Sequence, residues 1–205
     1  MAGLTLVLAS SSPYRRAILD KLGLNYQTCK PAIDETPEAG ESASQLVQRL
    51  AEQKARAAID KLPDLGDALV IGSDQVALFE QQILGKPITA ERAIEQLTGF
   101  VGKTVTFLTG LSLYNTRSDT AETICVPFEV NFRSDLSRDE LARYVQLEQP
   151  LNCAGSFKSE GLGISLFTSL KGDDPNTLIG LPSIELLKML RKHDVNPLAR
   201  DNPLA

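Results

Sequence analysis

Residues 4–22 read LTLVLASSSPYRRAILDKL, and this order of apolar, small polar and amphipathic segments predicts a strand, a loop and a helix. Residues 4–9 are apolar throughout, which is typical of a strand that is buried on both faces. Ser12 and Pro13 suit the N-cap and the first position of a helix, because proline has no amide proton to leave unpaired there. Gly23 is the stop signal that ends this helix.

The loop in this stretch gathers groups that bind anions. Backbone amides, the Ser12 hydroxyl and the positive end of the helix dipole meet there beside Arg15 and Arg16. Phosphate is the anion that such a combination binds most often. The segment by itself is equally compatible with an ordinary capped helix that carries two solvated arginines.

Length and composition limit the class of protein. The 205 residues fit one domain, 42% of them are hydrophobic and 23% are charged, as in ordinary soluble proteins. The net charge of −5 argues against non-specific binding to nucleic acid or anionic membranes, since both need a basic surface. No apolar run is long enough to span a membrane and the start of the chain lacks a signal-peptide pattern, so we expect a cytoplasmic protein.

Cysteine and histidine usage limits the metal chemistry. The three cysteines, Cys29, Cys125 and Cys153, are odd in number and widely spaced, which favours reduced thiols over disulfides or a zinc knuckle. His193 is the only histidine, which argues against His-rich metal sites and a Ser-His-Asp triad. A metal bound here would therefore be a hard cation held by carboxylates.

Three further segments carry candidate charged residues. Asp34 and Glu35 are adjacent acids in a polar loop, and they either form a turn or face a cation. Lys54 lies in the middle of a predicted helix, where a solvated lysine is the alternative. A predicted strand over residues 68–73 places Asp74 and Gln75 at its carboxyl end, where ligand sites of open α/β sheets gather. An aspartate in that position can equally be a turn residue.

The rest of the chain predicts a mixed α/β fold with a partly antiparallel, twisted sheet and flanking helices. Two alternating runs, residues 103–114 and 121–132, predict an antiparallel hairpin. Capping boxes that begin at Ser42 and Ser137 predict two helices, and residues 178–179 predict a short strand. Residues 198–205 are expected to form a frayed tail.

Eight motifs along the chain follow one another in the order and spacing of a known family. They are SSSPYRR (10–16), IDETP (33–37), EQKA (52–55), IGSDQ (71–75), GKP (85–87), FR (132–133), CAGSFKSEG (153–161) and NTLIGLP (176–182). With them the chain resembles the Maf family of nucleotide pyrophosphatases up to about residue 190. Each motif is weak by itself, and their common register is what makes the resemblance specific.

The resemblance implies a fold and a reaction. The fold is a single two-lobed domain over residues 1–197, similar to the inosine triphosphate pyrophosphatases, with the nucleotide in a cleft. The reaction is water attack between the α- and β-phosphorus atoms of a nucleoside triphosphate, which releases the monophosphate and diphosphate. A divalent cation, Mg²⁺ or Mn²⁺, and often a homodimer are implied as well.

The resemblance also implies roles for particular residues. It assigns Asp74 as the proton acceptor for the attacking water, and Glu35 as a metal ligand together with Asp74. A triphosphate needs matching positive charge and oriented donors. We expect these from four segments, through Ser12, Arg15, Lys54 and Lys86. Asp34 is left out of this predicted set.

Within the family, the chain is most similar to the branch that hydrolyses 7-methyl-GTP. The branch that acts on dTTP and UTP typically has arginine, threonine and glutamine where this chain has Tyr14, Gln75 and Glu160. A tyrosine face attracts the positive charge of an N7-methylated guanine, and a glutamate accepts from both donors of its Watson–Crick edge. The alternatives are that Tyr14 packs on its own helix and Glu160 is solvated, that the activity is of the dTTP/UTP type, or that the chain is a nucleotide-binding regulator of cell division without turnover.

Overall fold

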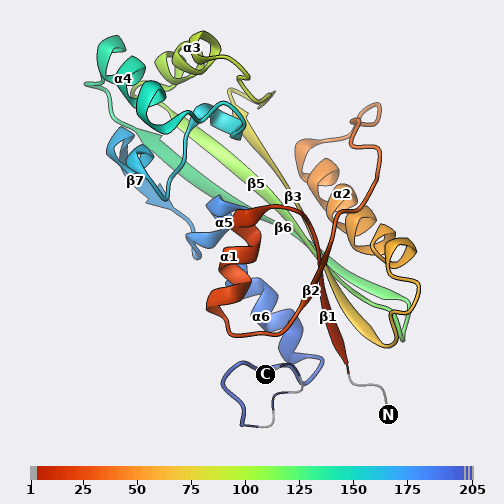
Figure 1. Ribbon diagram of the computed structural model, residues 1–205. Coiled ribbons are helices and arrows are strands. Elements are labelled where there is room, and N and C mark those ends of the chain that lie inside the picture. The colour runs from red at the N-terminus through yellow and green to blue at the C-terminus, as the bar shows by residue number, and fades with distance from the viewer. Residues whose placement is uncertain (1–3, 201, 203, 205) are drawn as a thin grey trace. The chain divides into compact units, whose positions relative to one another are not determined.

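The structure is a computed structural model that describes residues 4–200, 202 and 204. Within these residues seven strands form one sheet in the order β2-β1-β3-β5-β6-β7, with β4 paired to β3 (Figure 1). The strands are β1 (Thr5–Ala9), β2 (Gln27–Cys29), β3 (Ala68–Phe79), β4 (Gln82–Leu84), β5 (Thr104–Asn115), β6 (Thr120–Phe132) and β7 (Phe167–Lys171). β1 pairs in parallel with β2 and β3, whereas the β3–β4 and β6–β7 pairs are antiparallel. The predicted mixed α/β class is therefore confirmed.

Six α-helices and three short 3₁₀ helices complete the described part of the chain. They are α1 (Pro13–Lys21), α2 (Ala43–Ala57), α3 (Ala90–Phe100), α4 (Arg138–Glu148), α5 (Asn176–Ile179), α6 (Ser183–Arg191), η1 (Ile59–Lys61), η2 (Ala154–Ser156) and η3 (Leu162–Leu166). The capping boxes predicted at Ser42 and Ser137 open α2 and α4.

The described residues divide into two compact units. Unit 1 contains those of Met1–Gln75, Thr109–Val126 and Gly180–Ala205, and unit 2 contains Val76–Leu108 and Pro127–Ile179. The strands β3, β5 and β6 contribute residues to both units. A single two-lobed domain over residues 1–197 stays a prediction.

The stretch of residues 4–22 forms the predicted strand, loop and helix in unit 1. Ser12 caps α1 by accepting a hydrogen bond from the Arg15 amide at 3.4 Å, and Pro13 is the first helical residue. Gly23 follows the helix with φ of +64°, a conformation that glycine adopts without steric cost. The predictions for the two ends of this helix are thus confirmed.

Alternation along β3 gives the strand two faces in unit 1. Val70 belongs to a buried cluster with Ala55 at the end of α2, and Gly72 faces α2 directly. Leu69 and Ile71 are fully buried on the opposite face, as expected for a period of two. Figure 1 shows α2 on one side of these strands, with α1 and α6 on the other side.

The prediction that Asp74 ends a strand is wrong, because β3 continues from Ala68 to Phe79. The polar run after Gly72 reads as a loop, yet each of its side chains has a partner: Ser73 donates to the Gly180 carbonyl, Asp74 pairs with Lys54 and Gln75 donates to Thr109. These partners allow the extended backbone to continue. The parallel ladder with β1 does end earlier, at the pair Leu8 and Ile71, so Asp74 lies just beyond that ladder.

Unit 2 has its own hydrophobic core, in which aromatic rings dominate. Phe132 packs against Phe100, Phe157 and Phe167 with centroid distances of 5.1 to 5.7 Å, mostly edge to face. Leu141 and Val145 of α4 are buried in the same cluster. This core supports α4 and the loops that follow it.

Two predictions concern the end of the chain, and one of them differs from the structure. Residues 178–179 belong to the short helix α5, not to a strand, because Asp174 accepts the Asn176 amide at 2.8 Å and starts a helical turn. The expected frayed tail includes residues 201, 203 and 205, which lie outside the described residues. Leu204 is buried and its carbonyl accepts a hydrogen bond from the Asn25 amide at 2.8 Å, so this position is held by contacts.

Candidate functional site

Lys54 joins the two predicted metal-binding carboxylates in unit 1. Its Nζ atom lies 2.6 Å from Asp74 Oδ1 and 2.8 Å from Glu35 Oε1. The side chains of Lys54 and Asp74 are only 11% and 13% exposed, whereas Glu35 is 61% exposed. Three residues from a helix, a strand and a loop therefore converge on one point.

The local fold explains this convergence. α2 starts at the Ser42 cap and carries Lys54 near its end, on the side that faces the sheet. Gly72 lets the helix lie close to β3, because a Cβ atom there would be 1.9 Å from the Ala51 carbonyl oxygen. Asp74 is two residues further along the same strand and so points to the same face, towards the helix.

Arg15 is fixed by the segment that precedes α6. Its Nε atom donates to the Gly180 carbonyl at 2.8 Å, and Nη1 lies 3.4 Å from the Ser10 hydroxyl. The buried Ser73 hydroxyl donates to the same Gly180 carbonyl at 2.8 Å. Gly180 has φ of +106°, and a Cβ atom there would be 3.3 Å from Arg15 Nε. A glycine is thus needed at this position.

Charges of both signs surround Arg15. Desolvation lowers the pKa of its guanidinium, while the negative charges of Asp74 and Glu35 act in the opposite direction. Two cations, Arg15 and Lys54, therefore share one neighbourhood with two carboxylates. An anionic ligand can compete with these carboxylates for the cations, and a metal cation can compete with Lys54 for the carboxylates.

The fit of a divalent metal rests on Glu35 and Asp74. Both supply hard oxygen atoms to one point, which Mg²⁺ and Mn²⁺ prefer. Within residues 4–200, 202 and 204, no group of three or more His, Cys, Asp or Glu side chains could hold a metal ion. The two carboxylates therefore suit a cation that completes its shell with water and phosphate oxygens. Asp34 instead accepts the Thr36 amide at 2.9 Å in a turn, and hydrogen bonds from the Thr36 side chain and amide lower its pKa.

The other predicted residues of unit 1 lie on α1 and β3. Tyr14 is 41% exposed, so part of the residue is open to solvent. Gln75 donates from Nε2 to the Thr109 hydroxyl of β5 at 2.8 Å, which fixes its amide. The Ser12 amide donates to the Ser10 hydroxyl at 3.1 Å, so the loop before α1 is held by its own side chains.

Lys86 and Glu160 belong to unit 2, and both side chains are exposed. Burial raises the pKa of the Cys153 thiol, and this thiol also senses the charges of Lys158, Glu160 and Lys86. Lys86 and Glu160 therefore lie within electrostatic range of the same thiol. The structure brings Arg15, Glu35, Lys54 and Asp74 together in unit 1, whereas Lys86 and Glu160 lie in unit 2.

Sequence reasoning missed several residues that hold the predicted ones. They are Ser10, Ser73, Thr109 and Gly180. Ser10 and Ser73 carried a detectable signal, because each is a small polar residue at the end of a strongly apolar run. Gly180 is part of the motif at residues 176–182, but nothing in the sequence relates it to Arg15, which lies 165 positions earlier.

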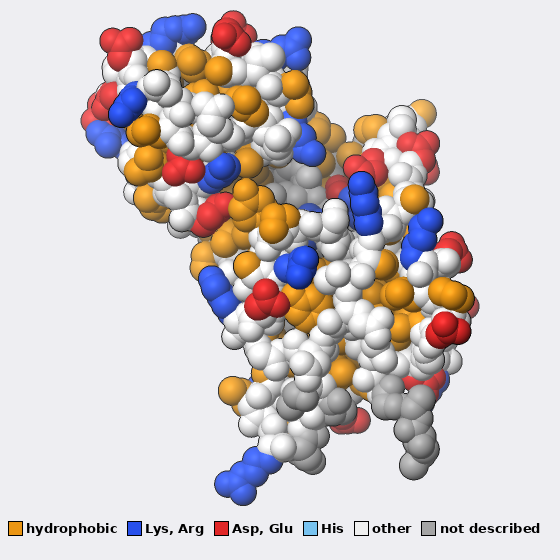
Figure 2. Space-filling view, viewed as in Figure 1, with side chains coloured by type: hydrophobic (Ala, Val, Ile, Leu, Met, Phe, Trp, Pro, Cys, Tyr) orange, Lys and Arg blue, Asp and Glu red, His pale blue; other side chains and the backbone are white. Residues whose placement is uncertain are grey.

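The distribution of surface charge is relevant to binding of nucleic acid, and the length of the helices is relevant to membrane insertion. On the face drawn in Figure 2, the described Lys and Arg side chains lie among Asp and Glu side chains and do not gather into a basic stripe. A basic stripe is the usual footprint of a nucleic-acid binder. In the described part of the chain, no helix is both long and apolar enough to cross a membrane.

Comparisons with known proteins cover almost the whole chain. The family model described as Maf-like protein matches residues 5–193. The 7-methyl-GTP pyrophosphatase of Idiomarina loihiensis is 59% identical over 198 residues, which cover 97% of this chain and 99% of that protein. The protein of the same name from Vibrio cholerae is 52% identical over 196 residues, covering 96% and 99%. Among solved structures, the chain is similar to the Ham1 protein of Staphylococcus aureus, with a TM-score of 0.48, 15% identity and coverage of 93% and 99%.

Proposed function

The chain belongs to the Maf family, and on this premise we propose that it hydrolyses 7-methyl-GTP to 7-methyl-GMP and diphosphate. Relatives named 7-methyl-GTP pyrophosphatase share more than half of their residues with it over nearly their full length. Among the structural observations, the Glu35–Lys54–Asp74 contact carries the proposal, because it combines two metal-binding carboxylates with a cation for phosphate. The role in the cell would be to remove a modified nucleotide from the pool.

Three charged residues of unit 1, Glu35, Lys54 and Asp74, have parts in the proposed reaction. Glu35 and Asp74 would hold Mg²⁺ or Mn²⁺, and the bound cation would neutralise phosphate charge and make water more acidic. Asp74 accepts the proton of the attacking water. Lys54 keeps both carboxylates close before substrate arrives and then provides a mobile positive charge for the phosphates.

Phosphate binding needs further donors. Arg15 has its Nε atom fixed on the Gly180 carbonyl, which orients the planar guanidinium for a bidentate contact with a phosphate. Ser12 caps α1, and the amides and dipole at that helix terminus favour an anion. We also assign Lys86, which is exposed in unit 2, to charge stabilisation of the triphosphate.

Base selection is assigned to Tyr14, Gln75 and Glu160. The ring of the partly exposed Tyr14 can attract the cationic base, with a gain of roughly 0.5–2 kcal/mol. Glu160 can accept from the guanine edge, and hydrogen bonds to charged groups contribute roughly 1.5–3 kcal/mol each. Gln75 is held by Thr109 and supplies a fixed amide.

A substrate panel tests the function. Purified protein is incubated with 7-methyl-GTP, GTP, dTTP and UTP, with Mg²⁺, Mn²⁺ or a chelator, and diphosphate release is measured. We expect the highest kcat/KM for 7-methyl-GTP and loss of turnover with the chelator. A preference for dTTP or UTP would establish the pyrimidine-type activity instead, and tight binding without turnover would support a regulator.

Two further parts of the proposal concern the state of the protein. We propose a cytoplasmic location and a homodimer, as the family resemblance implies. Light scattering at several concentrations measures the mass against the 22.2 kDa of one chain. A mass equal to one chain at every concentration would exclude the dimer.

A further inference from the structure

The segment of residues 158–162 carries Glu160 and is fastened to α4 at both ends. The Lys158 amide donates to the Tyr144 hydroxyl at 2.9 Å. The Leu162 amide donates to Glu148 Oε1 at 2.9 Å. Tyr144 and Glu148 are one helical turn apart, so both anchors come from the same side of α4.

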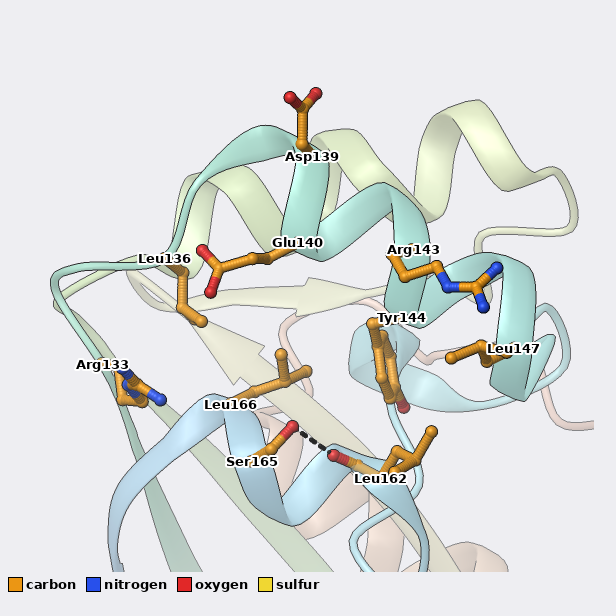
Figure 3. A pocket seen from close by; sticks show the side chains of 10 residues that line it. All are labelled: Arg133, Leu136, Asp139, Glu140, Arg143, Tyr144, Leu147, Leu162, Ser165 and Leu166. Atoms are coloured by element: carbon orange, nitrogen blue, oxygen red, sulfur yellow. Dashed lines mark hydrogen bonds between the residues drawn. The ribbon is translucent and has the colours of Figure 1, made fainter.

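Additional contacts tighten this arrangement. Lys158 Nζ donates to the Glu148 carbonyl at 2.6 Å and lies 4.0 Å from its carboxylate. The Ser165 hydroxyl donates to the Leu162 carbonyl at 2.7 Å, as the dashed line in Figure 3 shows. Figure 3 also shows Tyr144 reaching down from α4 towards Leu162, on the wall of a pocket of about 500 Å³. Every residue of this arrangement belongs to unit 2.

Two glycines permit the close approach. A Cβ atom at Gly161 would lie 2.7 Å from Glu148 Oε1 and would displace that carboxylate. A Cβ atom at Gly163 would lie 2.2 Å from the Lys158 carbonyl oxygen. The path of the segment therefore depends on glycine at both positions.

The anchors differ from Glu160 in their exposure. Tyr144 is 5% exposed, and the Glu148 and Lys158 side chains are 20% and 25% exposed. Burial raises the pKa of Tyr144, so its hydroxyl stays protonated over the working range of pH. Glu160 is exposed, and within the described part of the chain its carboxylate accepts one hydrogen bond, from the neighbouring Ser159 hydroxyl at 3.5 Å. The anchors thus hold the backbone and leave the Glu160 carboxylate free for a ligand.

We infer that Glu148 and Tyr144 are positioning residues that hold the segment of residues 158–162 so that Glu160 meets the guanine edge in one orientation. This inference rests on the proposed function, because it takes Glu160 as the residue that reads the base. Ordering the segment before binding removes an entropy cost that a base would otherwise meet when it binds the Glu160 carboxylate. The gain is larger for a guanine base than for uracil, because guanine has two donor groups on its Watson–Crick edge and uracil has one.

The test compares matched variants by the ratio of kcat/KM for 7-methyl-GTP to kcat/KM for UTP. Glu148→Ala removes the acceptor for the Leu162 amide, and Gly161→Ala displaces the same carboxylate without removing it. We expect each to lower the ratio about tenfold, the equivalent of one hydrogen bond. Glu148→Gln keeps an oxygen acceptor and should stay within about twofold of the wild type, while Tyr144→Phe should lower the ratio through the loss of the Lys158 anchor.

A second readout separates this inference from the proposed function. Amide hydrogen exchange of residues 158–163 should become faster in Glu148→Ala and stay slow in Glu148→Gln. Unchanged exchange in Glu148→Ala, or equal losses for 7-methyl-GTP and UTP, would overturn the positioning role. If the wild type does not prefer 7-methyl-GTP, the proposed function fails and the discriminating role fails with it, whereas the exchange data still decide whether the anchors hold the segment.

Discussion

Substitution of Asp74 tests the chemical role of its carboxylate with little change in the structure. Asp74→Asn keeps nearly the same shape but removes the charge that accepts a proton and pairs with Lys54 at 2.6 Å. We expect kcat to fall by roughly 10²–10⁴, the usual contribution of general-base catalysis. Steady-state diphosphate release measures the change, and circular dichroism checks that the fold persists.

Asp34→Asn is the matched control for this substitution. Asp34 is in the same polar loop as Glu35, but it accepts a backbone amide from Thr36, and an asparagine can do the same. Its kcat should stay close to the wild-type value. Full turnover in Asp74→Asn, with the fold intact, would remove Asp74 from the mechanism.

The three residues assigned to the base make a second prediction at this scale. The triple variant Tyr14→Arg, Gln75→Thr and Glu160→Gln replaces them with the residues typical of the pyrimidine branch. It should lose roughly 10²–10⁴ in kcat/KM for 7-methyl-GTP, because a cation-π contact and charged hydrogen bonds are lost together. Its turnover of dTTP and UTP should rise relative to 7-methyl-GTP. A substrate ranking identical to that of the wild type would contradict this account.

Among the elements, α2 depends on a glycine in the neighbouring strand. Gly72→Ala would place a Cβ atom 1.9 Å from the Ala51 carbonyl oxygen, and backbone atoms cannot move aside as a side chain can. The free energy of unfolding should drop by roughly 3 kcal/mol or more, at or beyond the upper end for overpacked cores. Urea unfolding measures the difference.

Gly99→Ala is the control for that change. Gly99 lies inside α3, and apart from its chain neighbours and the backbone of its own helix, no described heavy atom lies within 4 Å of the position of a Cβ atom there. Alanine should therefore raise stability by about 0.5–1 kcal/mol, through its higher helix propensity. A Gly72→Ala variant as stable as the wild type would mean that α2 does not approach β3 as closely as the structure shows.

The elements that sequence predicted well are those whose ends carry a local signal. Ser12 with Pro13, Ser42 and Ser137 each act within one turn of their helix, so short-range chemistry determines where the helix begins. The continuation of β3 through Asp74 could not be predicted in this way. Its polar residues are satisfied by partners far along the chain, such as Gly180 for Ser73. The strand predicted at residues 178–179 was wrong for another reason, because a short apolar run fits a strand and a helix equally well.

At the scale of the whole molecule, the candidate site combines residues whose spacing along the chain follows neither the helical nor the strand repeat. Glu35, Lys54 and Asp74 come from a loop, a helix and a strand; the sequence named them as separate candidates, and only the family register assigned them to one site before the structure did. Gly180, the partner of Arg15, is also part of that register, but the register did not show that the two residues meet across 165 positions. The residue types of the site were thus predictable from the sequence. The contacts that orient these residues became known only from the three-dimensional structure.

Acid stability is a property of the whole molecule, because many folded carboxylates have a lowered pKa. Glu41 shows the largest resolved change: its bidentate contact with Arg49 and the Glu38 amide lower its pKa from 4.5 to about 2. Five other acids have pKa values that are lowered by hydrogen bonds, namely Asp34, Asp67, Asp119, Asp135 and Glu140. For all of them the unfolded chain binds protons at a higher pH than the folded chain does.

The sign of the pH dependence follows from this difference. Where the unfolded state binds more protons, the free energy of unfolding rises with pH, so the stabilisation by Glu41 is complete above pH 4.5 and is lost as pH falls towards about 2. Urea midpoints measured between pH 2 and pH 6 should therefore decrease towards acid. Glu41→Gln should show a shallower decrease, whereas Glu38→Gln, which removes a 67% exposed charge 3.5 Å from the same Arg49, should follow the wild type. If Glu41→Gln and the wild type lose stability in parallel over this range, the Glu41–Arg49 contact does not contribute to acid stability.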